Sequence, residues 1–88
     1  YTATRTLASQ AADELLNISG ILTSFVLYPD GERVVISARS IGDVNVQVIL
    51  EPLGGGGNAA TAGAQVSGKT ARQVLMELVA SIDKFYEG

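Results

Sequence analysis

The sequence has 88 residues, 47% of them hydrophobic and 17% charged, with a formal net charge of -3 and neither cysteine nor histidine. A chain of this length folds as one domain around a single core. The missing residue types exclude disulfides, cysteine or histidine nucleophile systems and ordinary zinc sites. The six basic residues are dispersed, which argues against a long nucleic acid as partner, since that needs a basic stripe.

The chain begins with Tyr1 rather than methionine, which indicates a trimmed start or a fragment of a larger protein. No apolar run approaches the ~20 residues of a membrane helix, and the absence of cysteine is typical of a reducing compartment. We therefore expect a cytoplasmic domain that makes no membrane contact of its own. The nine acidic residues are scattered, so we expect no metal site, no bound cofactor and no catalytic residue in this chain.

The first segment predicts a helix over residues 7–17. Its apolar residues recur at helical spacing; they are Leu7, Ala11, Leu15 and Ile18. Thr6 or Ser9 is a suitable N-cap, and Gly20 is expected to end the helix in the left-handed conformation.

The next segment predicts a β-hairpin. Residues 21–28 are rich in β-branched and aromatic side chains, and residues 34–37 supply the returning strand. Pro29, Asp30 and Gly31 are expected to form the turn, because Pro fixes φ, Asp bonds nearby backbone and Gly accepts a positive φ.

Residues 44–53 support two interpretations. The valines alternate with polar residues, which favours a strand. Asp43, however, is a good N-cap, and Val44, Val48 and Ile49 would also share one face of a helix. The pattern alone leaves the choice open.

The last third of the chain predicts a short strand over residues 62–66 and a final helix capped by Thr70. Lys84 near the end of this helix suits the helix dipole. The predicted apolar stripe of the helix is Ala71, Val74, Leu75, Leu78, Val79, Ile82 and Phe85.

Four consecutive glycines, Gly54, Gly55, Gly56 and Gly57, precede this strand. Glycine lets backbone N–H groups approach an anion without interference from a Cβ, so the run could cradle a phosphate. It matches neither the Walker loop nor the dinucleotide fingerprint. The alternative is a flexible loop or a point where two backbones pack closely.

Arg39, at the end of the second hairpin strand, could supply the bidentate fork that phosphate oxygens favour. A solvated arginine at a strand end is the alternative. Asn45, Asn58 and Gln65 carry amides that could contact a base or sugar edge, although each could equally serve a turn or a cap.

The stretch "ISARSIGDVNVQVILEPLGGGGNAATAGAQ" resembles the DHH-associated C-terminal subdomain of DHH-type phosphoesterases, in particular the branch found in GdpP-type cyclic di-AMP phosphodiesterases of Firmicutes. The resemblance covers nearly the whole chain. It implies that residues 44–53 are helical. The implied fold is α+β, with a small mixed sheet built on a hairpin, about three flanking helices and a glycine-rich loop between helix and strand.

The resemblance also implies a function. In that family the subdomain clamps a cyclic dinucleotide or short oligonucleotide against a catalytic DHH subdomain of the same chain, which holds two manganese ions, in a parent protein that can be membrane-anchored. Arg39 and Ser40 match the family's phosphate-contacting pair, Gly54 to Gly57 match its loop, and Ala62 and Gly63 match the small residues that follow.

One position departs from the family pattern, because Asn58 stands where the family loop ends in histidine. An amide forms hydrogen bonds but carries no charge near pH 7. Two alternatives to the phosphodiesterase role remain. One is the same role in an oligoribonuclease or RecJ-like exonuclease; the other is a structural domain that forms a homodimer.

Overall fold

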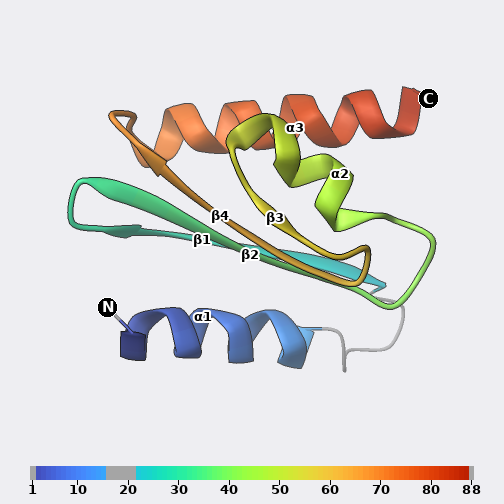
Figure 1. Cartoon of the computed structure of the whole chain (residues 1–88), viewed down its shortest axis with the longest axis horizontal. Helices are drawn as coiled ribbons and strands as arrows, with labels where there is room; N and C mark the ends of the chain where they lie inside the picture. Colours follow the sequence, from blue (N-terminus) through green and yellow to red (C-terminus); the bar gives the residue numbers. More distant parts are fainter. Residues whose placement is uncertain (1, 16–21, 88) are drawn as a thin grey trace.

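The computed structural model describes residues 2–15 and 22–87 (Figure 1). The elements in chain order are α1 (Thr2–Leu15), β1 (Thr23–Asp30), β2 (Arg33–Ser40), α2 (Val46–Leu50), a 3₁₀ helix (Glu51–Leu53), β3 (Gly56–Gly57), β4 (Thr61–Ser67) and α3 (Ala71–Glu87). The α+β class with three α-helices is confirmed.

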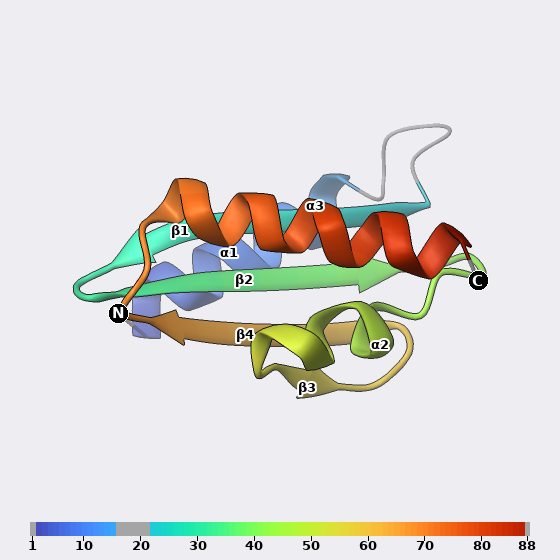
Figure 2. The same ribbon diagram turned by 90° about the horizontal axis from the view of Figure 1, so that it is seen from above.

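The four strands form one sheet in the order β1-β2-β4-β3. Helix α1 lies against one face of this sheet, and α2 and α3 lie against the other (Figures 1 and 2). All three strand pairs are antiparallel, so the prediction of a mixed sheet was wrong. The chain enters β4 through a tight turn after β3, and this reversal sets β4 antiparallel to both of its neighbours.

The β1–β2 hairpin is confirmed; β1 continues to Asp30, beyond the predicted end at residue 28, and β2 is longer than the predicted residues 34–37. Pro29 and Asp30 pair with β2 as the last residues of β1, so the turn consists of Gly31 and Glu32 rather than residues 29–31. Gly31 has φ +64°, a conformation that glycine adopts without a steric penalty. Pro29 is tolerated because β1 is an edge strand, where the missing N–H leaves no ladder bond unmade.

Helix α1 begins earlier than predicted, at Thr2 rather than near residue 7. Thr6 and Ser9 therefore lie inside the helix, and neither is its N-cap. Ala8 and Ala12, one turn apart, are buried, and the Ser24 hydroxyl of β1 donates to the Ala12 carbonyl at 2.7 Å. The predicted helix end at 17 and the role of Gly20 fall outside the described residues.

Residues 46–53 are helical, as the family resemblance implied and the alternation of valines did not. Val46, Ile49 and Leu50 are fully buried, whereas Val48 is 48% exposed; burial therefore follows the spacing of a helix. The N-cap is Asn45 rather than Asp43, because the Asn45 side chain accepts from the Val48 N–H at 3.2 Å.

The predicted N-cap of α3, Thr70, is confirmed, and it exchanges two hydrogen bonds with Gln73. The Gln73 N–H donates to the Thr70 hydroxyl at 3.1 Å, and the Thr70 N–H donates to the Gln73 side chain at 2.8 Å, which is a capping box. Only part of the predicted stripe is covered. Val74 and Leu78 are buried, but the rest of the stripe is half-covered or open, with Leu75 49% exposed.

The main core lies between the sheet and the layer of α2 and α3. Its buried residues are Val34, Ile36, Ala38, Val46, Ile49, Leu50, Leu53, Ala62, Ala64, Val66, Val74 and Leu78. The small alanines of β2 and β4 allow the short helix α2 to lie close to the sheet, so the glycine segment that follows α2 reaches the sheet edge.

Candidate functional site

The second face of the sheet, on the side of α1, carries a different set of residues. Val34, Ile36 and Ala38 of β2 belong to the core beneath α2 and α3, and successive side chains of a strand point to opposite faces. Ser37 and Arg39 therefore face the α1 side. In the described part of the chain α1 packs mainly on β1 and β2, which leaves the same side of β4 and β3 open.

A groove of about 390 Å³ lies on this open side. No large side chain fills the bottom of the groove, because small residues lie side by side on three strands. Ser37 of β2 pairs with Gly63 of β4, which pairs with Gly56 of β3. The lining residues are Ser9, Val35, Ile36, Ser37, Gly54, Gly55, Gly56, Gly63, Ala64 and Gln65. The groove thus joins the glycine run, the predicted Gly63 and one serine of α1.

Most N–H groups of the glycine run are committed within the chain. The Gly54 N–H donates to the Glu51 carbonyl at 3.0 Å, and the Gly55 N–H to the Leu50 carbonyl at 2.9 Å; these bonds close the 3₁₀ helix. The turn that joins β3 to β4 is also closed by a backbone hydrogen bond, because the Asn58 N–H donates to the Thr61 carbonyl at 2.7 Å.

Hydrogen-bonded and non-hydrogen-bonded pairs alternate along an antiparallel ladder. Because Asn58 and Thr61 form a hydrogen-bonded pair, the next such pair is Gly56 with Gly63, and Gly57 with Ala62 lies between them. The Gly57 N–H therefore points away from β4, at the sheet edge. The run offers an anion this single outward amide from β3, rather than a four-amide cradle.

Two of the glycines are required by close packing. A Cβ on Gly55 would lie 2.5 Å from the Gly63 carbonyl oxygen and 2.8 Å from the Ala64 Cβ. A Cβ on Gly57, whose φ is +146°, would clash with the Thr61 carbonyl. Gly56, by contrast, has nothing within 4 Å of its Cβ position. Close packing therefore explains why residues 55 and 57 are glycines. At Gly56 the lack of a side chain keeps the groove open.

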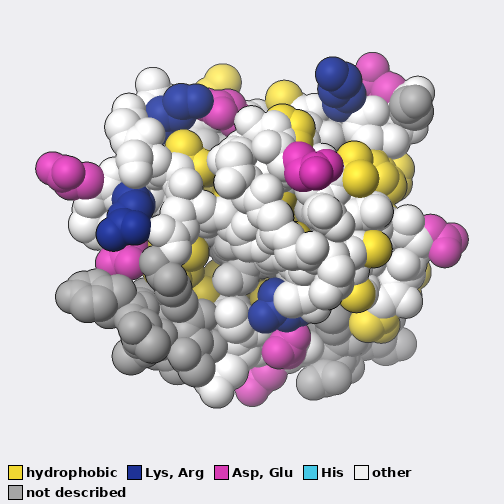
Figure 3. Space-filling model, in the orientation of Figure 1, with side chains coloured by type: hydrophobic (Ala, Val, Ile, Leu, Met, Phe, Trp, Pro, Cys, Tyr) yellow, Lys and Arg dark blue, Asp and Glu magenta, His cyan; other side chains and the backbone are white. Residues whose placement is uncertain are grey.

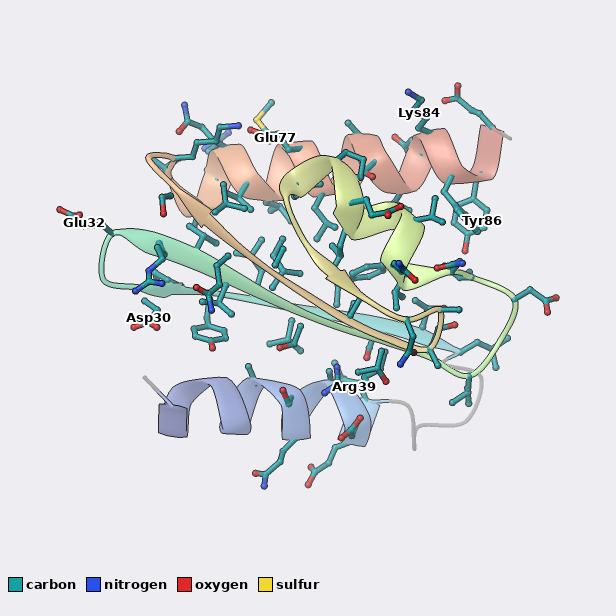
Figure 4. The ribbon with its side chains drawn as sticks, in the orientation of Figure 1. Asp30, Glu32, Arg39, Glu77, Lys84 and Tyr86 are labelled. Carbon is teal, nitrogen blue, oxygen red and sulfur yellow. The ribbon has the colours of Figure 1, made fainter. Side chains whose placement is uncertain are left out.

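Arg39 lies between the sheet and α1 (Figure 4). Its Nε donates to the Asp13 carboxylate at 2.8 Å and its Nη1 to the Ala38 carbonyl at 2.9 Å. Its side chain is 15% exposed and that of Asp13 is 62% exposed. These bonds use two of the five guanidinium N–H groups. Within the described part of the chain, the other three N–H groups donate to no protein acceptor. Arg39 is two residues from Ser37 on the same face, roughly 7 Å along the strand.

Ser40 and Ala62 are not brought to the groove. Ser40 follows Arg39 on the strand and points to the opposite face, where it is buried. Its hydroxyl lies 3.3 Å from the Gly42 N–H and 3.4 Å from the Thr23 hydroxyl. Ala62 is likewise buried in the core beneath α2 and α3. The geometry thus separates the Arg39–Ser40 pair that the family pattern had joined.

The three amide side chains have different environments. The Asn58 Oδ1 accepts from the Ala60 and Thr61 N–H groups at 2.9 Å each, so Asn58 shapes the turn between β3 and β4. Asn45 caps α2. Gln65 lines the groove, and its Oε1 accepts from the Arg33 Nη1 at 2.8 Å.

Our interpretation of the sequence missed Ser9 and Ser37. Ser37 could have been found, because it precedes Arg39 by two positions in a strand and must share its face. Ser9 had no comparable signal, since its place in the lining depends on how α1 crosses the sheet.

Charges of both signs are interspersed over the surface shown in Figure 3. Among the described residues no group of three or more acidic side chains could hold a metal ion. No helix within the described ranges is long and apolar enough to cross a membrane.

The family of this domain follows from its sequence. The whole chain, residues 1–88, matches the DHHA1 domain, and the protein belongs to that family.

Three curated relatives are cyclic-di-AMP phosphodiesterases. The chain is 49% identical to GdpP of Geobacillus thermodenitrificans, 47% to GdpP of Bacillus subtilis and 41% to PdeA of Listeria monocytogenes. Each match extends over 83 residues, which is 93% of this chain and 13% of the relative. The chain therefore spans about an eighth of the length of these relatives.

Proposed function

We propose that this chain is the nucleotide-binding subdomain of a cyclic di-AMP phosphodiesterase. It holds the dinucleotide in the groove beside the glycine run, against a catalytic DHH subdomain of the same protein. The observation that carries the proposal is that the groove and Arg39 occupy one face of the sheet. The relatives' shared activity on cyclic di-AMP supports the choice of ligand.

In this proposal Arg39 binds a phosphate. Asp13 and the Ala38 carbonyl hold its guanidinium from two sides, which orients the remaining N–H groups without occupying them. A charged bidentate contact of this kind is among the stronger hydrogen bonds in proteins. The outward Gly57 N–H and the hydroxyls of Ser9 and Ser37 supply neutral donors to the same ligand.

The cleavage chemistry belongs to the DHH subdomain. The described residues of this chain do not fit a metal site, so the two manganese ions expected for the family are assigned to that subdomain, where metal ions activate water for phosphodiester hydrolysis. In this proposal the contribution of this chain is to bind and orient the substrate.

The proposal is tested by titrating this chain with cyclic di-AMP and with the linear dinucleotide pApA, using amide chemical shifts as the readout. We expect shifts at Gly56, Gly57 and Gln65. Arg39→Ala should weaken binding by about tenfold or more, because a hydrogen bond to a charged group contributes roughly 1.5–3 kcal/mol.

Arg72→Ala is the matched control. Arg72 is an exposed arginine of α3, on the far side of the sheet, and its loss removes the same charge without touching the groove. Equal losses from both variants would indicate a nonspecific charge effect. The absence of any shift at millimolar ligand would contradict the proposed binding site.

A further inference from the structure

The Gln65 side chain is oriented by a hydrogen bond from Arg33, and both residues are exposed. Arg33 and Gln65 both lie on the groove face, Arg33 on β2 and Gln65 on β4, and the Arg33 Nη1 donates to the Gln65 Oε1 at 2.8 Å. A guanidinium has only donors, so the oxygen of the amide must face Arg33 and the NH₂ group must point elsewhere. Of the three amide side chains that the sequence singled out, those of Asn45, Asn58 and Gln65, only that of Gln65 lines the groove.

An amide held this way presents a fixed pattern. The Oε1 atom has a second lone pair beyond the one that Arg33 uses, and the NH₂ group is a donor. Adenine offers the complementary pair on one edge, an amino donor at N6 and an acceptor at N7, which glutamine contacts with two hydrogen bonds. Guanine offers two acceptors, O6 and N7, on the same edge.

We propose that Gln65 is a specificity-determining residue that selects adenine over guanine, and that Arg33 is the positioning residue that prevents its amide from turning over. This rests on the proposed function, because it places a base of the bound dinucleotide beside Gln65. Against guanine, the Gln65 oxygen would face O6. Turning the amide over would not relieve this conflict, because its oxygen would then face N7, the other acceptor of guanine, and its NH₂ group would face the Arg33 donor.

The selectivity thus has an attractive and a repulsive part. The attractive part is the two-bond contact with adenine. The repulsive part is the contact of the amide oxygen with a guanine acceptor, which occurs in either orientation of the amide and penalises guanine in the way that specific sites commonly exclude a competing ligand. Both parts depend on the Gln65 amide, and Arg33 adds to the attractive part by holding the amide in the orientation that adenine needs.

The test measures dissociation constants of this chain for pApA and for its guanosine counterpart pGpG, and takes their ratio. For the unaltered chain we expect pApA to bind about tenfold more tightly, within the range that one good base contact provides. Gln65→Met should bring the ratio close to one, mainly by weakening pApA binding.

Arg33→Met should also lower the ratio, but by a different route. The freed amide is no longer held in the orientation that adenine needs, so pApA binding should weaken, whereas guanine opposes the amide oxygen in either orientation and pGpG binding should change less. In the double variant the ratio should equal that of Gln65→Met alone, since Arg33 acts through Gln65. A control, Arg72→Met, should leave the ratio unchanged, because it lowers the charge by the same amount far from the groove.

The possible results separate this inference from the proposed function. If the unaltered chain binds neither dinucleotide, the proposed function fails. If it binds both and the ratio is one, or if Gln65→Met leaves a high ratio in place, the function stands and the role of Gln65 is overturned. If Gln65→Met lowers the ratio but Arg33→Met leaves it unchanged, the positioning role of Arg33 is overturned.

Discussion

The two faces of the sheet differ although the same strands form both. On the side of α2 and α3, β2 contributes Val34, Ile36 and Ala38 to a tightly covered core. On the side of α1 it contributes Arg33 and Arg39 at either end of a strand whose centre, Ser37, borders an open groove. Neighbouring residues thus serve stability and recognition in turn, and mutations one position apart should have separable effects.

The largest expected effect is on the core face. Ile49→Ala removes a fully buried side chain of the core beneath α2 and α3 that does not line the groove and should lower the free energy of unfolding by about 2–5 kcal/mol. Urea denaturation followed by circular dichroism measures this loss. Dinucleotide affinity of the folded fraction should stay the same, and a loss of affinity larger than the unfolded fraction explains would contradict the separation of the two faces.

Two variants of the glycine run extend the comparison between packing and recognition to the edge of the sheet. Gly55→Ala would press a methyl group against the Gly63 carbonyl and Ala64 and should destabilise the domain by about 1–3 kcal/mol. Gly56→Ala is the matched control, because its Cβ meets nothing within 4 Å. It should fold almost normally while narrowing the groove. Thermal unfolding of the two variants gives the comparison, and equal destabilisation would refute it.

The smallest effect on stability is expected at the ion pair on the groove face. Asp13→Asn weakens the 2.8 Å contact with Arg39, and since Asp13 is largely exposed the loss should be at most about 1 kcal/mol. The affinity for pApA should nevertheless fall severalfold, because Arg39 loses its orienting partner. An increase in affinity would show instead that Asp13 competes with the phosphate.

The hairpin and the last helix were predictable from local signals. Gly31 required a turn, and Thr70 with Gln73 formed a capping box. The region of residues 46–53 was not, because its valines alternate as in a strand, and packing of α2 against β4 and α3 separates the buried Val46 from the exposed Val48. The antiparallel order of the sheet likewise depends on the reversal between β3 and β4.

The candidate site was predictable by residue type and less so by arrangement. Gly63 and the first three glycines of the run, Gly54 to Gly56, line the groove, but alternation along β2 and β4 places Ser40 and Ala62 on the opposite face of the sheet, where they are buried. The contact between Arg39 and Asp13 joins positions 26 apart in sequence, and that between Arg33 and Gln65 joins positions 32 apart. Such pairs arise from tertiary folding, which no local pattern encodes.

Both edges of the sheet are protected against strand addition by another molecule. Exposed edge strands can template aggregation, and proline or very short strands are the usual safeguards. Here Pro29 lies in the edge strand β1, and β3, the opposite edge, consists of only two residues. The glycine edge can thus present an outward amide to a small ligand while remaining too short to recruit a neighbouring chain into a continuous sheet.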